Sequence, residues 1–469
     1  MKDIRYALKR LFKPQSVAVI GASGSSKKLG FHVMKSLVSG GFRGRIVPIN
    51  PKSKEILGIS TFPSLNSCDE DIDLAIVVLP SSIVEEILRQ CVKKGIKAVV
   101  LISAGFKEMD DPVGGILQDR LSEFADSHGM SIIGPNTFGM INLHHQLNAS
   151  FTPQFSQLKK GRVSLLSQSG GMSHLLGFLA MSENVGMSKI IGLGNRLNLD
   201  FPEMISYLEE DPFTEIIMLY LEGIERGREL LETFSKIDSP KPIIAYKAGI
   251  GIHKDRASLS HTGTVAGRKE IYEGAFMQAG ILSVQSAHEL LDTAKALSIC
   301  PIPLGPRVAI LSGQAGPGIC CADVCSKDGL EIVQFSKESQ KVIDKILPPM
   351  THRSNPVDMG PLWYNSEAMA DIVEAVIRDR DVDSVIILMM FASANLDIVD
   401  VLLDRLNNIK INKPVITCFN APQYLWKEAI HNGEENRVIA NFPTPERAAR
   451  AMVNLFRYSM LKRGWQDGY

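Results

Sequence analysis

The chain has 469 residues, of which 45% are hydrophobic and 22% charged, a composition that excludes a disordered or fibrous protein. Its 51 lysines and arginines balance 51 aspartates and glutamates, so no overall positive field is present to hold nucleic acid. One hydrophobic core rarely organises a chain of this length, and we therefore expect three domains.

The first part of the chain alternates short apolar runs with helical segments. The runs SVAVIGA, RIVPIN, LAIVVLP and AVVLISAG are rich in Val and Ile, which is typical of a parallel sheet buried on both faces. Between the third and fourth runs, we expect a helix with Ile83, Ile87, Leu88 and Cys91 on its buried face. These features predict a doubly wound domain over residues 1–133.

The same pattern restarts twice along the chain. The runs RVSLLSQSG, KIIGLGN, EIIMLYLEG and KPIIAYKAG predict a second open sheet within residues 134–299. After the proline-rich stretch SICPIPLGP, the run RVAILSGQAGPG begins a third within residues 300–469. A last helix is expected from Thr444, with Pro445 in its first turn.

Membrane and secretory signals are missing from the sequence. The longest apolar run, around Val385, falls well short of the roughly 18–20 residues that cross a bilayer. The N-terminal segment lacks the apolar core of a signal peptide. We therefore expect a cytoplasmic protein without membrane contact.

The first Gly-rich turn favours a phosphorylated ligand. In VAVIGASGSSKKLG the chain leaves a strand, turns at Gly21 and Gly24, and enters a helix whose N-terminus attracts anions. The next glycine is Gly30, which departs from the G-x-G-x-x-G fingerprint, and a turn without a ligand is the alternative. A dinucleotide site would place a carboxylate after the second strand, where this chain has Asn50 and, two residues later, Lys52. Because Lys52 can meet a phosphate, CoA fits this turn better than NAD does.

A phosphohistidine site is predicted from three separate stretches. The polar segment DRASLSHTGTVAG carries a single histidine, His261. The turn SQSGG, residues 167–171, precedes a helix whose N-terminus could bind phosphate. Glu222 ends the strand EIIMLYLEG, and a carboxylate that accepts from one imidazole nitrogen leaves the other free to act as nucleophile. A surface or structural histidine is the alternative at residue 261.

With these motifs, the chain resembles the alpha subunits of ADP-forming acetyl-CoA synthetases and, more distantly, the alpha subunit of succinyl-CoA synthetase. The resemblance covers nearly the whole length and is carried, in the family's order, by LFKPQSVAVIGAS, ISAGF, IGPN, SQSGG, YLEG, SHTGTVAG, NPVDM and TPERAARAM. It implies an α/β fold: a Rossmann-like CoA-binding domain over residues 1–133, then two flavodoxin-like doubly wound parallel-sheet domains over residues 134–299 and 300–469.

The resemblance also implies a reaction and its residues. Acyl-CoA, phosphate and ADP would give carboxylic acid, CoA and ATP reversibly, through acyl phosphate and phosphohistidine. His261 would carry the phosphoryl group between two sites, and Glu222 would orient it. The phosphate would be held by Ser169, Gly170 and Gly171. The CoA site would be lined by Gly21, Ser23, Lys52, Pro80, Ser103 and Asn136.

The implied reaction needs a partner. Three α/β domains leave no room for an ATP-grasp nucleotide site, so the resemblance implies a separate beta subunit and an alpha2beta2 heterotetramer. ADP or ATP with Mg²⁺ would bind that subunit, and no metal site is expected in this chain. A non-catalytic module that senses acyl-CoA and an NAD-dependent oxidoreductase are the alternative functions.

Four further features carry expectations of their own. Thr137 stands in GPNT where many relatives have GPNC, and we expect altered packing near the acyl site rather than lost chemistry. The turn GQAGPG, residues 313–318, is interpreted as structural. His144 and His145 are expected to be a solvated pair. The seven cysteines lack CxxC pairs and are expected to be buried thiols in a reducing compartment.

Overall fold

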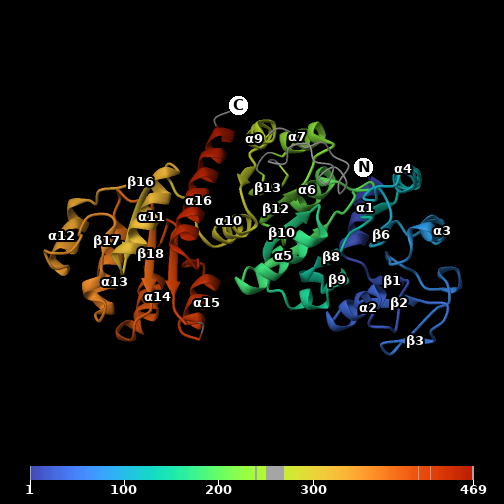
Figure 1. Cartoon of the computed structure of the whole chain (residues 1–469), viewed down its shortest axis with the longest axis horizontal. Helices are drawn as coiled ribbons and strands as arrows, with labels where there is room; N and C mark the ends of the chain where they lie inside the picture. Colours follow the sequence, from blue (N-terminus) through green and yellow to red (C-terminus); the bar gives the residue numbers. More distant parts are fainter. Residues whose placement is uncertain (1, 238–239, 250–268, 410, 423, 467–469) are drawn as a thin grey trace. The chain divides into compact units, whose positions relative to one another are not determined.

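The computed structural model describes residues 2–237, 240–249, 269–409, 411–422 and 424–466 (Figure 1). The chain divides into two compact units, Met1–Gln285 and Ser286–Tyr469. The first unit contains two large sheets and the second contains one.

The first sheet is parallel, with strand order β2-β1-β5-β6-β7. Every residue of β1, β5, β6 and β7 is buried, which explains why these runs show no alternation of apolar and polar residues. Its strands are β1 (Ser16–Ile20), β2 (Arg45–Ile49), β5 (Leu74–Val77), β6 (Ala98–Leu101) and β7 (Ser131–Ile133), with a small hairpin of β3 (Glu55–Ile56) and β4 (Ile59–Ser60). Its helices are α1 (Lys2–Phe12), α2 (Leu29–Ser39), α3 (Ser81–Lys93) and α4 (Pro112–Ser127), with the short η1 (Leu65–Ser67).

Helix α3 differs in detail from the prediction. Its buried face carries Val84, Leu88 and Cys91, which follow the i, i+4, i+7 spacing of a helix packed on a sheet. Ile83 lies one position off this face and is 44% exposed, so its predicted burial is wrong. The helix ends before Gly95, which adopts the left-handed conformation with φ +75°.

The second sheet has strand order β14-β13-β12-β10-β11-β8-β9. Five strands are parallel, of which β10, β11, β12 and β13 were predicted and β14 was not. In addition, β8 pairs antiparallel with β11 and with β9 and so adds an unpredicted hairpin at the other edge. The strands are β8 (Gly139–Asn142), β9 (Leu147–Ser150), β10 (Lys160–Ser167), β11 (Met187–Gly192), β12 (Ile216–Leu221), β13 (Ile243–Lys247) and β14 (Leu282–Val284). The helices are α5 (Gly170–Ser182), α6 (Phe201–Glu210), α7 (Gly227–Ser235) and α9 (Lys269–Gln278), with the short η2 (Leu143–His145) and η3 (Pro153–Gln157).

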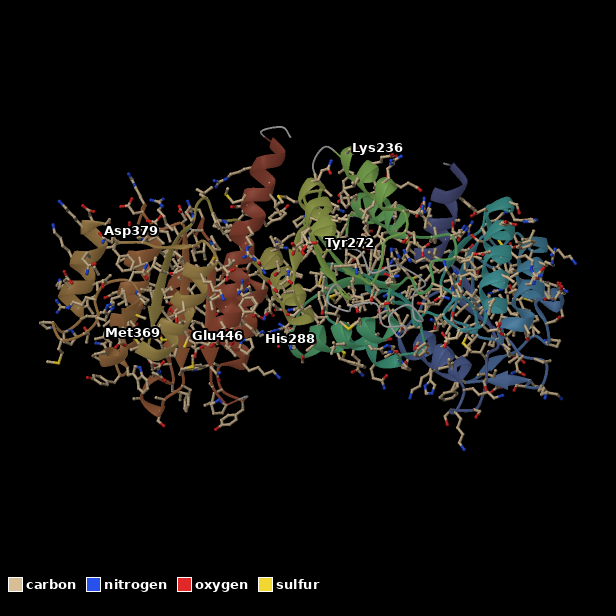
Figure 2. All side chains as sticks on the ribbon, turned by 45° about the horizontal axis from the view of Figure 1, so that its top comes forward. Lys236, Tyr272, His288, Met369, Asp379 and Glu446 are labelled. Carbon is tan, nitrogen blue, oxygen red and sulfur yellow. The ribbon has the colours of Figure 1, made fainter. Side chains whose placement is uncertain are left out.

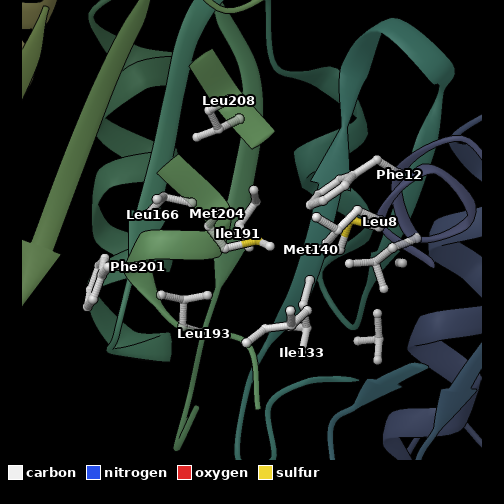
Figure 3. Close-up of a cluster of buried hydrophobic side chains, with 14 of the residues drawn as sticks. Leu8, Phe12, Ile133, Met140, Leu166, Ile191, Leu193, Phe201, Met204 and Leu208 are labelled. Carbon is white, nitrogen blue, oxygen red and sulfur yellow. The ribbon is translucent and has the colours of Figure 1, made fainter. Parts of the chain in front are cut away.

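The first two sheets share one hydrophobic core. Figure 3 shows Leu8 and Phe12 of α1 against Met140 of β8, and these residues belong to a single buried cluster that extends into the second sheet. The Phe12 ring stacks on Tyr207 of α6, with ring centres 4.3 Å apart. The Asn142 side chain donates to the Phe12 carbonyl oxygen at 2.9 Å. Helix α1 thus joins the two sheets into one body.

The third sheet is parallel, with strand order β16-β15-β18-β19-β20, and β17 also pairs with β15. Its strands are β15 (Arg307–Ser312), β16 (Glu331–Ile332), β17 (Val357–Asp358), β18 (Ser384–Met390), β19 (Val415–Asn420) and β20 (Ala440–Asn441). Its helices are α10 (Ala287–Ile299), α11 (Ala315–Lys327), α12 (Lys337–Ile346), α13 (Ser366–Arg378), α14 (Ile398–Asn407), α15 (Lys427–Glu435) and α16 (Pro445–Gln466), with the short η4 (Gly360–Leu362) and η5 (Ser393–Asn395).

Helix α16 begins with Pro445 as predicted, and it holds α10 to this unit. Arg447 forms an ion pair with Asp292 at 2.7 Å, and the Asn454 amide donates to the Thr293 hydroxyl at 2.9 Å. Across the described ranges, no helix combines the length and the apolar character needed to cross a membrane.

Candidate functional site

The first Gly-rich turn follows β1 at the point where the sheet order reverses, because β1 pairs with β2 on one side and β5 on the other. Gly21 has φ +95°, and a Cβ atom there would lie 2.4 Å from the Val78 carbonyl oxygen. A Cβ atom on Gly30 would lie 2.0 Å from the Gly21 carbonyl oxygen. Only glycine therefore lets the start of α2 approach the strand end. Its N-cap residue, Lys28, makes no side-chain capping bond, which leaves the helix N-terminus available to an anion.

Asn50 ties the end of β2 to this turn. Its amide donates to the Ala22 carbonyl oxygen at 2.7 Å, and its Oδ1 accepts from the N–H of Lys52 at 2.8 Å. The Lys52 side chain is exposed. Ser23 is buried, and its hydroxyl oxygen accepts from the N–H of Ser25 at 3.1 Å. An amide thus stands where dinucleotide-binding domains carry a carboxylate.

The other predicted CoA-site residues follow the next three strands of the same sheet. Pro80 is exposed immediately before α3. The Ser103 hydroxyl oxygen accepts from the N–H of Leu79 at 3.3 Å, and the Ser103 carbonyl oxygen accepts from the N–H of Asn136 at 2.8 Å. Asn136 is exposed, with φ +54°. The structure therefore places all six predicted residues in loops at the carboxyl edge of one sheet.

Glu108 was not predicted and organises this edge. Its carboxylate accepts from the N–H groups of Gly105 at 2.6 Å and Phe106 at 3.2 Å, and from the Asn195 amide at 2.5 Å. Asn195 in turn accepts from the Asn136 amide at 3.3 Å. Because an internal carboxylate already occupies these backbone N–H groups, they do not offer an anion site to a ligand.

The second turn, SQSGG, joins β10 to α5. The Ser167 hydroxyl donates to the Ser169 carbonyl oxygen at 2.8 Å, and the Ser169 hydroxyl oxygen caps the helix by accepting from the N–H of Met172 at 3.4 Å. Gly170 and Gly171 are the first two helical residues, and their N–H groups make no hydrogen bond to another described residue. We call residues 167–171 the phosphate turn, after the role that the sequence predicts for this helix N-terminus.

Glu222 follows β12, the strand beside β10, and so lies next to the phosphate turn. The N–H groups of Glu222 and Gly223 donate to Gln168 Oε1 at 2.8 Å and 3.0 Å. Burial, together with the negative charge of Glu222, raises the pKa of Tyr220. The predicted position of Glu222 at the strand end is confirmed.

Lys247, the last residue of β13, was not predicted either. Its side chain is buried, and its ammonium donates to the carbonyl oxygens of Glu222 at 2.8 Å and Ala248 at 2.5 Å. Burial lowers the pKa of Lys247, and the nearby Glu222 charge opposes that effect. A lone lysine at a strand end has no sequence signature. The role of Lys247 becomes visible only from its short distance to Glu222.

His261 lies within residues 250–268, outside the described residues. Its relation to Glu222 and to the phosphate turn therefore stays a prediction.

The expected solvated histidine pair is wrong. His144 stacks on Phe213 with ring centres 4.3 Å apart, and its Nε2 lies 2.8 Å from the Gly161 carbonyl oxygen. His145 meets the same ring edge-on, and its buried Nε2 has no partner in the described part of the chain. Burial, with the positive charge of Lys13, lowers the pKa of His145.

Thr137 is buried, and its hydroxyl makes two hydrogen bonds. The hydroxyl donates to the Gly192 carbonyl oxygen at 2.6 Å and accepts from the N–H of Gly139 at 3.1 Å. It therefore fastens the loop after β7 to the end of β11.

The cysteines are free thiols, of which six are buried. Cys320 is exposed on α11, so the expectation that all seven are buried is wrong for this residue. Among the described residues, no three His, Cys, Asp or Glu side chains are grouped to hold a metal ion.

The turn GQAGPG repeats the backbone pattern of the phosphate turn in the other unit. The Ser312 hydroxyl donates to the Gln314 carbonyl oxygen at 2.5 Å, and the N–H of Gly313 donates to the Leu388 carbonyl oxygen at 2.8 Å. In the phosphate turn, Ser167 and Gln168 make the corresponding bonds. This similarity by itself assigns no chemistry to the turn.

Comparison with known proteins assigns families to the regions that contain the first two sheets. Residues 15–142 match the CoA binding domain family, and residues 160–297 match the family described as the succinyl-CoA ligase like flavodoxin domain. These matches confirm the predicted Rossmann-like and flavodoxin-like folds of the first two sheets.

Full-length relatives extend the comparison over the whole chain. The alpha subunit of acetate–CoA ligase [ADP-forming] II from Pyrococcus furiosus is 35% identical over 467 residues, covering 97% of this chain and 99% of that protein. Acetate–CoA ligase [ADP-forming] I from Archaeoglobus fulgidus is 34% identical and covers 97% of this chain but 64% of that protein. The solved structure of a dinucleotide forming acetyl-coenzyme A synthetase 1 from Ca. Korarchaeum cryptofilum, in complex with phosphate and ADP, superposes with a TM-score of 0.89 at 33% identity and covers 98% of both chains.

Proposed function

This chain belongs to the family of the alpha subunits of ADP-forming acetate–CoA ligases, and we propose that it converts acyl-CoA, phosphate and ADP reversibly to carboxylic acid, CoA and ATP. The reaction would take place in the cytoplasm, where thiols stay reduced.

The proposed chemistry has three steps. An oxygen of inorganic phosphate attacks the thioester carbonyl, the carbon–sulfur bond breaks, and acyl phosphate forms as CoA leaves as a thiolate that takes up the proton lost by phosphate. An imidazole nitrogen of His261 then attacks phosphorus, and the carboxylate leaves with the electron pair of the phosphorus–oxygen bond. ADP finally accepts the phosphoryl group from His261 to give ATP.

Described residues support two parts of this chemistry. The loops around Gly21 and Ser103 present a helix N-terminus and small polar groups to the CoA phosphates. Gly170 and Gly171 present N–H groups to the phosphoryl oxygens. The observation that carries the proposal is the placement of Glu222 beside this turn, since its carboxylate can accept from one imidazole nitrogen and stabilise the charge that develops on the ring.

A separate subunit would supply the nucleotide site. The chain spans 99% of a relative that is named as an alpha subunit but 64% of a longer relative whose name carries no subunit designation, which supports a partner that carries the remaining part. We propose that the partner is an ATP-grasp beta subunit in an alpha2beta2 heterotetramer. Mg²⁺, bound with ADP or ATP on that subunit, would neutralise phosphate charge.

Phosphohistidine chemistry gives the decisive test. Incubation of the complete enzyme with Mg²⁺ and labelled ATP should label this chain with a phosphoryl group that is acid-labile and alkali-stable. His261→Ala should abolish the label and turnover while CoA binding persists. Glu222→Gln should fold normally but slow labelling, because an amide cannot stabilise a cationic ring electrostatically. An alkali-labile label, or a label that survives in His261→Ala, would contradict the proposed mechanism and favour the sensing alternative.

The CoA site has its own test. The Lys52 position predicts that the chain binds CoA more tightly than dephospho-CoA and shows no comparable affinity for NAD, as measured by calorimetry. Lys52→Ala should remove the preference between the two CoA forms. Equal affinity of the unsubstituted chain for both forms would refute the role of Lys52.

A further inference from the structure

The peptide of Glu222 is held on both sides by side chains from the two neighbouring strand ends. Gln168, which follows β10, accepts from the N–H groups of Glu222 and Gly223 at 2.8 Å and 3.0 Å. Lys247, which ends β13, donates to the Glu222 carbonyl oxygen at 2.8 Å. Since β12 lies between β10 and β13, these bonds fasten its end from both directions.

Gln168 couples this arrangement to the phosphate turn. It is the second residue of that turn and is 7% exposed. Its own N–H donates to the Tyr220 carbonyl oxygen at 3.1 Å, while its side chain reaches past the end of β12. A shift of the phosphate turn would therefore move Gln168 and, through it, the Glu222 peptide.

Lys247 carries an unusual charge for a buried position. The side chain is 4% exposed, and its hydrogen-bond acceptors are two neutral carbonyl oxygens. The ammonium also lies 4.7 Å from the ring centre of Tyr272, which Figure 2 labels on α9. Within the described ranges, it forms no ion pair. The carboxylate whose charge acts on it is that of Glu222.

Lys241, two residues before the start of β13, provides a comparison. It also donates to two backbone carbonyl oxygens, those of Leu208 and Asp211, both at 2.7 Å. Three carboxylates act on its charge, from Glu209, Asp211 and Glu215. Lys241 thus has three carboxylates acting on its ammonium, whereas Glu222 is the carboxylate that acts on Lys247, at the edge where the phosphoryl group is proposed to bind.

We infer that Gln168 and Lys247 are positioning residues that clamp the Glu222 peptide and so fix its carboxylate relative to the phosphate turn. The inference rests on the proposed function. The clamp reduces the freedom of Glu222 before the imidazole arrives, and reduced freedom in the ground state favours a fixed reacting geometry. The Lys247 charge also offsets the repulsion between the Glu222 carboxylate and an incoming phosphoryl group.

The test compares Lys247→Met with Lys241→Met in the complete enzyme with its partner subunit. Both changes remove a lysine ammonium that donates to two backbone carbonyl oxygens, but only the first touches Glu222. We expect Lys247→Met to slow phosphohistidine formation and kcat at least tenfold while KM for CoA stays unchanged. Lys247→Arg, which keeps the charge and the donors, should recover part of the rate. Lys241→Met should lower the unfolding temperature and leave the labelling rate unchanged.

A double-mutant cycle separates positioning from a general structural role. In a Glu222→Gln background, Lys247→Met should add less than a twofold further loss, because its effect acts through the Glu222 carboxylate. Gln168→Ala tests the other half of the clamp and should also slow labelling at least tenfold. If Lys247→Met does not fold, the labelling rate of Gln168→Ala tests the clamp in its place.

The outcomes distinguish the two proposals. If the unsubstituted enzyme acquires no phosphohistidine, the proposed function fails. If it is labelled but folded Lys247→Met or Gln168→Ala is labelled equally fast, the clamp is wrong and the function stands. A full tenfold loss in the Glu222→Gln background would also overturn the clamp, since the residue would then act independently of Glu222.

Discussion

The contact between Gly30 and the first Gly-rich turn allows a sharp prediction about the CoA site. In Gly30→Ala, the added methyl group would lie 2.0 Å from the Gly21 carbonyl oxygen and 3.2 Å from the Ala22 Cα atom. These neighbours are backbone atoms and cannot turn aside. The start of α2 must therefore move away from the turn by about 1 Å to reach an ordinary contact.

The size of the effect follows from this displacement. Overpacking of this kind costs about 1–3 kcal/mol of unfolding free energy, and each kcal/mol lowers the transition midpoint by about 2–4 °C in a unit of this size. A shift of about 1 Å at the helix N-terminus also breaks at least one hydrogen bond to a phosphate, worth about 1.5–3 kcal/mol. We therefore expect the Kd for CoA to rise about ten- to 150-fold.

Gly24→Ala is the matched control, because it makes the same change within the turn that Gly30 of α2 approaches. A Cβ atom on Gly24 would have no heavy atom within 4 Å beyond its chain neighbours, so this variant should bind CoA and unfold like the original chain. Calorimetric titration with CoA and a thermal scan measure both effects. If Gly30→Ala binds CoA as tightly as Gly24→Ala, the close approach of α2 to the turn does not determine affinity.

Two further predictions concern buried polar groups. Asp211→Asn removes the carboxylate that pairs with the fully buried Lys189 and should lower the free energy of unfolding, measured in urea, by about 3–5 kcal/mol. Glu215→Gln at the exposed pair with Arg162 is the control and should lower it by less than about 1 kcal/mol. Equal losses in the two variants would contradict this reasoning. Burial acts to raise the pKa of Asp211, but hydrogen bonds from Lys189 and Thr214 outweigh it and hold this pKa below its usual 3.8, so the stability from this pair should be present above pH 3.8 and lost as the pH falls further. Thr137→Val should lower the free energy of unfolding by about 1–3 kcal/mol, because two buried hydrogen bonds disappear. Thr137→Cys keeps a small polar group and should lower the free energy of unfolding less. A thermal scan in which both variants match the original chain would show that the hydroxyl is dispensable.

The predictable parts of the fold are those set by local patterns. Uninterrupted Val and Ile runs identified the central strands, and the turns at Gly21 and Ser167 could be placed because they follow such runs directly. Glu222 could be placed for the same reason. Because the carboxyl ends of parallel strands lie at one edge of a sheet, residues that follow different strands can be predicted to lie close together even when their side-chain contacts are unknown.

The residues that escaped prediction depend on distant partners. Phe213 covers His144 and His145 only after the chain has folded, and no spacing in the sequence links them. The role of Glu108 becomes visible only from its hydrogen bond with Gly105, and the role of Lys247 only from its hydrogen bond with Glu222. Charged side chains normally stay in water, so the neighbouring sequence does not predict that a given charged residue is buried.

The core that α1 builds between the first two sheets makes the two edges of this unit thermodynamically dependent on one another. Since neither sheet can lose its apolar packing alone, an opening that exposes β10 and β12 must also disturb the turn at Gly21. A ligand held there at 100 times its Kd would add about 2.7 kcal/mol to such an opening by mass action. Amide hydrogens beside Glu222 should then exchange about 100-fold more slowly with solvent.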